Sequence, residues 1–321
     1  MTALSSAQPE IICLGEPMVE FTRRADNAPR DQAAGETLYQ QGFGGDTSNT
    51  AIAAARQGAS VGYITAVGQD EFGTALLDLW QAERVDVSRV RRHATAKTGI
   101  YFITPHPAGR SFTYFRAGSA ASLISPADLP ADYIAGAKVL HVSAISQAIS
   151  ASARDAVFRA IEIAREHQVL VSYDSNLRRN LWPLDEARDV THRAMRICDI
   201  AFPSIDDSRE LTGLTHADEI ADFYLSLGAR IVALKLGAEG ALIATAEQRV
   251  AIPPYPVTPV DATGAGDAFD GAFLARYCQT GDPVAAGRYA AVTAARTTCG
   301  YGALSTLPRA AEVERLLAGW K

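Results

Sequence analysis

The sequence has no excess of positively charged residues, and this argues against a protein that binds nucleic acid. Its 30 Lys and Arg residues are outnumbered by 36 Asp and Glu residues, which gives a formal net charge of −6. Proteins that bind nucleic acid neutralise phosphates with an excess of basic residues, and no basic run occurs here. We therefore expect no nucleic-acid partner.

Cysteines, long apolar runs and a leader segment are also rare or missing. The 4 cysteines are scattered without a CxxC pair, so free thiols in a reducing cytoplasm are favoured over structural zinc or disulfides. No apolar run approaches the ~20 residues of a membrane helix. The N-terminal segment lacks a basic region followed by an apolar stretch, as a signal peptide would have. We expect a cytoplasmic protein with no membrane segment.

What the sequence does contain is an alternation of short apolar runs with longer helical patterns. Runs such as 60–68 are typical of strands, and segments such as 47–58 have helical periodicity. This alternation indicates βαβ units and a mostly parallel central sheet flanked by helices. The length suits one large α/β domain or two modest ones. Because no linker or repeat divides the chain, we expect a single domain over 1–321.

Two segments interrupt this alternation. Residues 17–43 and 93–118 contain short strands and turns but no crossover helix. In the second segment, the runs GIYFI and SFTYF flank the turn-rich TPHPAGR, which predicts a β-hairpin. We expect the two segments to form a small β-sheet beside the main domain, where it would act as a lid.

The segment DATGAGDAFDGAF, residues 261–273, combines flexible small residues with carboxylates. Glycines allow a tight turn and close approach to a ligand, and the apolar spacing that follows predicts a helix. Unpaired N–H groups at a helix N-terminus attract anions, which makes Gly264, Ala265 and Gly266 a candidate anion hole. Asp267 beside it would suit proton transfer; the alternative is that Asp267 only caps the helix.

Two common phosphate-binding patterns are absent. The P-loop GxxxxGK[ST] does not occur, and no lysine follows a glycine-rich turn. The dinucleotide fingerprint GxGxxG fails on spacing, because Thr47 and Phe269 stand where a third glycine would be. A Rossmann dehydrogenase therefore fits poorly.

Two motifs together resemble those of the PfkB (ribokinase-like) carbohydrate kinases. GFGGDTSNTAIAAARQG (42–58) resembles the N-terminal signature of that family, and DATGAGDAFDGAF resembles its C-terminal signature. The resemblance covers nearly the whole chain. It implies a ribokinase-like α/β fold that transfers the γ-phosphoryl group of ATP to a sugar hydroxyl with the help of Mg²⁺. By this resemblance Asp267 is the general base, and the preceding amides form the anion hole. Dependence on a monovalent cation such as K⁺, and assembly as a homo-oligomer, stay open.

Three finer segments resemble 2-keto-3-deoxygluconate kinase more than fructokinase or ribokinase. They are GEPMVEF (15–21), YFRAGSAAS (114–122) and YDSNLRRNLW (173–182). The implied substrate is a six-carbon keto-sugar acid, phosphorylated at its terminal hydroxyl, whose carboxylate needs a cationic partner that a neutral hexose does not. The resemblance assigns sugar contacts to Gly44, Gly45, Tyr101, Tyr114, Arg116, Arg178 and Asp267.

Four of these side chains also have structural interpretations. Arg116 could form a surface salt bridge, and Tyr101 and Tyr114 could simply pack within the lid. Arg178 could hold Asp174 in the sheet.

The nucleotide side of the site departs from the family pattern. The common Asn-x-x-Glu motif, linked to magnesium and phosphate placement, reads Ser204-Ile205-Asp206-Asp207. Asp207 keeps a carboxylate that could hold Mg²⁺ through water, or could belong to a solvated helix cap. In LKLGAEG (234–240), Leu236 replaces the Arg that this branch often has. The resemblance places ATP contacts at Asn176, Ser204, Lys235, Gly237, Gly264 and Gly266.

Two rival functions remain at this point. The nearer one is a fructokinase or another neutral-sugar kinase of the same family. The other is a non-catalytic sugar or nucleotide sensor on a kinase fold. The intact GAGD segment argues against a sensor, because a sensor has no need for the base.

Overall fold

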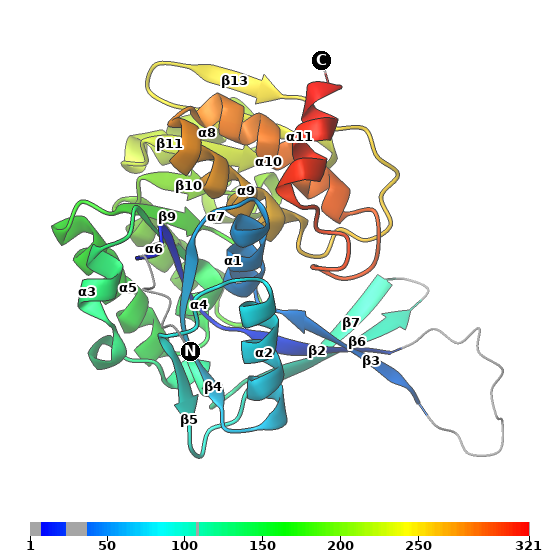
Figure 1. Ribbon diagram of the computed structural model, residues 1–321. Helices are drawn as coiled ribbons and strands as arrows, with labels where there is room; N and C mark the ends of the chain where they lie inside the picture. Colours follow the sequence, from blue (N-terminus) through cyan, green and yellow to red (C-terminus); the bar gives the residue numbers. More distant parts are fainter. Residues whose placement is uncertain (1–7, 24–36, 107–108, 321) are drawn as a thin grey trace.

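The computed structural model describes residues 8–23, 37–106 and 109–320. Its main body is a nine-stranded sheet with helices on both faces, and a second sheet of four strands projects beside it (Figure 1). Residues 24–36 of the first predicted lid segment, and 107–108 of the predicted hairpin turn, lie outside the described residues.

The large sheet is parallel over most of its width. In spatial order its strands are β13 (Arg249–Ile252), β12 (Ala241–Ala244), β11 (Ile231–Lys235), β10 (Ile200–Phe202), β9 (Leu170–Asp174), β8 (Val139–Ser143), β1 (Ile11–Leu14), β4 (Val61–Gly68) and β5 (Val90–His93). Neighbours from β11 to β5 run parallel, and β12 runs antiparallel to both of its neighbours. The predicted fold class is confirmed.

Helices bury both faces of this sheet. One face is covered by α1 (Asp46–Arg56), α2 (Glu71–Ala82), α9 (Ala265–Thr280), α10 (Pro283–Thr297) and α11 (Ala310–Ala318). The other is covered by α3 (Ala131–Ala135), α4 (Ala144–Ala148), α5 (Ala151–Glu166), α6 (Leu184–Met195), α7 (Ile205–Thr212) and α8 (Ala217–Leu227). Strand β1 shows why: Ile11 and Cys13 belong to one core, Ile12 and Leu14 to the other. A strand buried on both faces is a continuous apolar run, as its sequence predicts.

The small sheet comes from the two segments that interrupt the alternation. Its strand order is β3 (Tyr39–Gly44), β2 (Met18–Arg23), β6 (Gly99–His106) and β7 (Gly109–Phe115). Strands β6 and β7 form the predicted hairpin, and their pairing continues to His106 opposite Gly109. Most of TPHPAGR is therefore strand rather than turn. The pair β2–β6 is parallel, so the sheet joins two distant segments of the chain.

Five of the helices and strands are missing from the sequence-based prediction: β5, α3, α4, α7 and β13. Strand β13 has only 4 residues and lies at the sheet edge, where partial exposure removes the apolar run that predicts a buried strand. Helix α7 has 8 residues, IDDSRELT, too few and too polar to show a clear apolar stripe.

Among the described residues, no helix is long and apolar enough to cross a membrane.

Candidate active site

Helix α9 begins inside the GAGD segment, at Ala265. Gly264 precedes it with φ +76° and no side-chain cap. A Cβ at position 264 would lie 2.5 Å from the Cβ of Ala303, so both backbone conformation and space call for glycine. Asp267 lies in the first turn rather than at the cap position. The interpretation of Asp267 as the helix cap is therefore wrong.

The first turn of α9 presents free amides. Neither the Gly266 nor the Asp267 N–H donates a hydrogen bond to any residue that the structure describes, whereas the Ala265 N–H donates to the Ala262 carbonyl at 3.2 Å. The predicted anion hole is therefore wrong at Ala265, because its amide is already paired. A Cβ added at Gly266 would have only the Lys235 side chain near it, with Nζ at 3.6 Å. Unpaired amides and a neighbouring ammonium form a surface suited to phosphate oxygens.

These glycines give a testable contrast. We expect Gly266→Val to fold and to lose more than ~99% of the activity, because its side chain fills the space beside the free amides. We expect Gly264→Ala to lower the melting temperature, since its added Cβ meets Ala303 at a positive φ. Thermal unfolding and turnover of both variants check this. An active Gly266→Val variant would remove the anion-hole assignment.

Asp267 is held by a side chain from the N-terminal signature. Asn49, on α1, donates from Nδ2 to Asp267 Oδ2 at 2.8 Å. Burial, together with the negative charge of Asp46, raises the pKa of Asp267 to about 7, although the Asn49 hydrogen bond opposes the shift. A carboxylate that titrates near neutral pH is a better proton acceptor than an ordinary aspartate.

This pKa predicts how the rate depends on pH. A general base must be ionised to accept a proton, so kcat/KM should rise tenfold per pH unit below about 7 and level off above it. The measurement is kcat/KM from pH 5 to 9 at saturating Mg²⁺. A flat profile down to pH 5 would contradict the raised pKa.

Polar contacts connect the N-terminal signature to the end of β9. Asn176 donates from Nδ2 to Asp46 Oδ2 at 3.3 Å and from its backbone N–H to Asp174 Oδ1 at 3.1 Å. Asp174 is the last residue of β9. The carboxyl ends of parallel strands are where α/β proteins bind their ligands, and Asn176 lies at that edge of the sheet; its contact with phosphate stays a prediction.

Lys235, the last residue of β11, is enclosed by two carboxylates. Its Nζ lies 3.0 Å from Asp174 Oδ1 and 3.1 Å from Asp270 Oδ1. The charge of these carboxylates raises the pKa of Lys235 despite burial, which lowers it. The ammonium therefore stays charged at the N-terminus of α9.

Ser204 is the cap of helix α7, whereas Asp207 has a different role. Ser204 caps α7, its Oγ accepting from the Asp207 N–H at 3.1 Å. Asp207 Oδ2 accepts from the Leu177 N–H at 3.1 Å and from Ser175 Oγ at 3.3 Å. Burial and the charge of Asp174 raise the pKa of Asp207. The solvated-cap interpretation of Asp207 is wrong, because this carboxyl group is tied to the loop after β9.

Two predicted contact residues are exposed. Arg178 donates from Nη1 to the Leu177 carbonyl at 2.9 Å, so it does not hold Asp174, whose partner is Lys235. Gly237 follows β11 at φ +61° with open space around its Cα. Neither residue hydrogen-bonds to the group formed by Asp46, Asn49, Asn176, Lys235 and Asp267, called the Asp267 cluster below. The positive charge of Arg178 nevertheless acts to lower the pKa of Asp46 and of Asp207.

The small sheet brings aromatic residues over the site. Tyr101 donates to Glu20 Oε2 at 2.5 Å and stacks on Tyr114 with ring centroids 5.6 Å apart. A Cβ at Gly44 would lie 2.4 Å from the Tyr101 hydroxyl oxygen, so Gly44 leaves room for this tyrosine. Burial, the Glu20 carboxylate and, more weakly, the Asp267 carboxylate raise the pKa of Tyr101.

Arg116 pairs with a carboxylate of its own chain. Its Nη2 contacts Glu16 Oε2, and the two side chains are only 12% and 0% exposed. The guanidinium also lies over the Tyr114 ring, 5.4 Å from the centroid. Its Nε is buried and makes no hydrogen bond to any described residue. The alternative interpretation of Arg116, a surface salt bridge, is wrong as to exposure, because the salt bridge is buried. Gly45, at φ +100°, passes so close to the Glu16 carbonyl that a Cβ would lie 2.4 Å from it.

The small sheet also touches the loop that leads into α9. Arg110, on β7, donates to Asp261 Oδ1 and to Thr263 Oγ1, both at 3.0 Å. Burial would raise the pKa of Asp261, but hydrogen bonds from the Gly302 amide, Thr263 and Arg110 lower it to about 2. The small sheet is therefore tied to the loop that leads into the first turn of α9.

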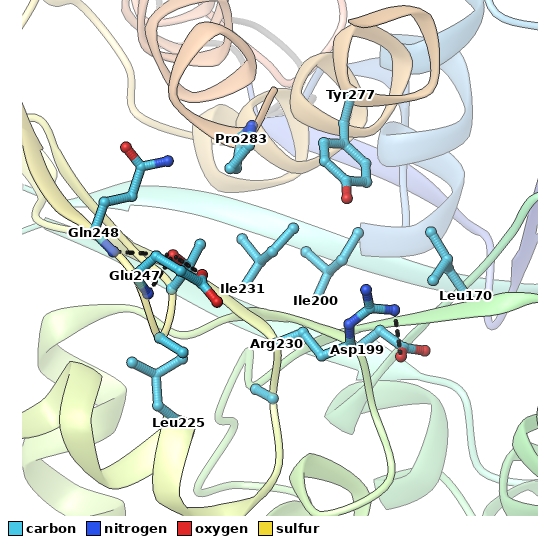
Figure 2. Close-up of a pocket in the computed structure, with 13 residues that line it drawn as sticks. Leu170, Asp199, Ile200, Leu225, Arg230, Ile231, Glu247, Gln248, Tyr277 and Pro283 are labelled. Carbon is cyan, nitrogen blue, oxygen red and sulfur yellow. Dashed lines mark hydrogen bonds and ion pairs between the residues drawn. The ribbon is translucent and has the colours of Figure 1, made fainter. Parts of the chain in front are cut away.

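A separate pocket of about 470 Å³ lies at the opposite edge of the large sheet (Figure 2). It is lined by the first residues of three parallel strands, Leu170, Ile200 and Ile231, with Tyr277 above them. No predicted site residue lines it. Because ligands of α/β sheets bind at the carboxyl ends, we place the active site at the Asp267 cluster.

Comparison with known families agrees with this arrangement. A family model described as "pfkB family carbohydrate kinase" matches residues 8–310. The chain belongs to this family. The PfkB kinase fold thus accounts for both sheets and for the two signatures that meet at Asp267.

Curated relatives of this PfkB kinase fall into two substrate groups. The chain is 33% identical to the 2-dehydro-3-deoxygluconokinase of Thermoproteus tenax, over 98% of this chain and 95% of the relative. It is 32% identical to the probable fructokinase-4 of Arabidopsis thaliana, over 99% and 100%. Among solved structures, a putative ribokinase II from E. coli in complex with ATP and Mg²⁺ has a TM-score of 0.87 at 26% identity, covering 97% of this chain and 99% of that one.

Four polar residues of the candidate site are absent from the sequence-based prediction. They are Glu16, Asp46, Asn49 and Asp270. The first three lie inside segments already singled out for their resemblance, at 15–21 and 42–58. Asp270 follows Asp267 by three positions, so both lie on one side of α9; an aspartate within the apolar run AFDGAFLA was the available signal.

Proposed function

We propose that this carbohydrate kinase transfers the γ-phosphoryl group of ATP to the terminal hydroxyl of 2-keto-3-deoxygluconate, giving the 6-phosphate. The observation that carries the proposal is the pairing of Asp267, whose pKa is near 7, with the free amides of the first turn of α9. ATP as the donor fits a cytoplasmic reaction.

The chemistry follows from that pairing. A substrate hydroxyl between Asp267 and the α9 N-terminus would give its proton to the carboxylate as its oxygen attacks the γ-phosphorus. The bond between that phosphorus and the bridging oxygen breaks, and ADP leaves with the bond's electron pair. The free amides and the Lys235 ammonium stabilise the charge on the transferring phosphoryl group.

Magnesium fits this site in one specific way. Among the described residues, no group of three or more His, Cys, Asp and Glu side chains is placed to hold a metal. Mg²⁺ beside a nucleotide commonly keeps most of its water and binds phosphate oxygens plus one or two carboxylates. Asp207 would hold it through water, and Mg²⁺ would neutralise charge on the phosphates.

Arg116 supports an acidic sugar. The guanidinium pairs with Glu16, but its side chain is still 12% exposed, which leaves surface for a second carboxylate. A substrate carboxylate would share the guanidinium with Glu16, and the nearby stack of Tyr101 and Tyr114 would cover the sugar.

A second candidate, fructokinase, is favoured by one observation. Glu16 already pairs with Arg116, so the pair is neutral before substrate binds. A neutral ketose would need no further charge compensation, and Glu16 could accept its hydroxyl protons.

The proposal is tested by ADP release from Mg-ATP over a panel of sugar acids and neutral sugars. We expect turnover with 2-keto-3-deoxygluconate and a phosphate ester on the terminal carbon, assigned by ³¹P–¹H correlation. Binding of ATP and sugar without turnover would indicate a sensor instead. Turnover with neutral sugars alone would mean that the substrate is a neutral sugar and not 2-keto-3-deoxygluconate.

A further inference from the structure

A buried cluster of charged groups lies directly behind the first turn of α9. It consists of Asp174 from β9, Lys235 from β11 and Asp270 from α9. Lys235 Nζ lies 3.0 Å from Asp174 Oδ1, and 3.1 and 3.2 Å from the two Asp270 oxygens. Three elements that are far apart in the sequence thus meet at one ammonium group.

The pKa values of the two aspartates in this cluster shift in opposite directions. Burial would raise the pKa of Asp174, but the positive charge of Lys235 and hydrogen bonds with Asp270 and Lys235 together lower it. Burial and the negative charge of Asp174 raise the pKa of Asp270 well above its usual value. The positive charge of Lys235 thus offsets negative charge directly behind the N-terminus of α9.

The cluster opens toward the site only through its ammonium. The Lys235 side chain is 13% exposed, whereas those of Asp174 and Asp270 are 5% and 0% exposed. Lys235 Nζ lies 3.6 Å from where a Cβ of Gly266 would be, next to the free amides of that turn. An ammonium has three donors, and two carboxylate partners leave one for a ligand.

A purely structural role explains this arrangement poorly. Burying charges costs free energy that apolar side chains of similar size would not cost, so a buried ion pair by itself is weak evidence of stabilisation. A long lysine side chain is flexible in solution, and two carboxylates fix its head group in one place. Such fixation matters where a cation must meet a ligand oxygen.

We propose that Asp270 is a positioning residue: with Asp174 it fixes the Lys235 ammonium beside the first turn of α9, where the ammonium contacts a phosphate oxygen of the nucleotide. This inference rests on the proposed use of ATP and adds a residue that acts through Lys235. It does not depend on the identity of the sugar.

The test is a double-mutant cycle on nucleotide affinity. ADP binding is titrated calorimetrically, without sugar, for wild type, Asp270→Ala, Lys235→Met and the double variant. We expect Lys235→Met to weaken ADP binding about 10- to 100-fold, the effect of losing a charge-assisted hydrogen bond. We expect Asp270→Ala to weaken it at least ~5-fold in wild type and less than ~2-fold in Lys235→Met.

Two further variants separate positioning from stability. Asp270→Asn keeps an oxygen that can accept from Lys235 Nζ, so it should recover most of the affinity. It also replaces Asp270→Ala if that variant does not fold. Glu83→Ala removes the partner of Arg56, which is 13% exposed like Lys235, away from the Asp267 cluster. It should lower the melting temperature and leave ADP affinity within ~2-fold of wild type.

The outcomes are distinct. An equal loss of ADP affinity from Asp270→Ala in both backgrounds, or no loss in a folded variant, overturns the positioning role. The KM for sugar should change less than ~2-fold in Asp270→Asn, and a larger change in the sugar KM than in ADP affinity also overturns it. If the wild-type protein binds ADP but phosphorylates none of the sugars, the proposed substrate is wrong. The ADP titrations still decide whether Asp270 positions Lys235.

Discussion

We expect Asp267→Asn to lower kcat by at least ~10²–10⁴-fold while sugar and ATP still bind. The amide keeps the size of the carboxylate and can still accept the hydrogen bond from Asn49, but it cannot take the hydroxyl proton. The measurement is steady-state turnover together with calorimetric binding of both substrates. A kcat close to that of wild type would mean that Asp267 is not the base.

Stability provides the control for this variant. Because the pKa of Asp267 is about 7 in the folded protein and near 3.8 when exposed, ionising it costs the folded state free energy. This loss of folding stability is absent below pH ~4, increases between pH 4 and 7, and reaches its full size above pH 7. We therefore expect Asp267→Asn to be more stable than wild type at pH 8 by about 1–3 kcal/mol, with no difference near pH 4. If Asp267→Asn is instead less stable than wild type at pH 8, its lost activity would be explained by misfolding.

The second large effect concerns the substrate. We expect Arg116→Ala to reduce kcat/KM for 2-keto-3-deoxygluconate roughly ten- to hundredfold more than for fructose. Only the sugar acid has a carboxylate that would pair with Arg116, so only the acid loses that contact. Comparing two substrates on one enzyme cancels any general damage from leaving Glu16 unpaired. Equal losses on both substrates would contradict the contact.

Glu16→Gln is the matched variant for this prediction. It removes the carboxylate that competes for Arg116, so the ratio of kcat/KM for the acid to that for fructose should move the opposite way and rise. A fall in that ratio would indicate that Glu16, rather than the substrate, is the partner that Arg116 needs.

The fold could be predicted from the sequence because local patterns carry it. Strand β1 is a continuous apolar run, and a parallel strand buried on both faces requires one. The β6–β7 hairpin was visible because apolar runs flanked a turn-rich segment. Strand β13 and helix α7 were missed because a short edge strand and a polar helix have too few buried residues to leave a pattern.

The site could be predicted only in part because its pairings span long stretches of chain. The spacing in GAGD places Asp267 beside the anion hole, which is a local property. The partner of Arg116 is 100 residues away and that of Lys235 is 35 residues away. No spacing rule identifies Glu16 among many carboxylates, or shows that Asp174 belongs to Lys235 rather than Arg178. Such pairings follow from the order of strands in the sheet.

The most direct test of the account is the substrate preference of the wild-type enzyme. With Mg-ATP at pH 8, kcat/KM is measured for 2-keto-3-deoxygluconate and for fructose by coupled ADP release. The account predicts that the sugar acid is preferred by at least ~10-fold, the value of one charge-assisted contact to Arg116. A preference for fructose would contradict it.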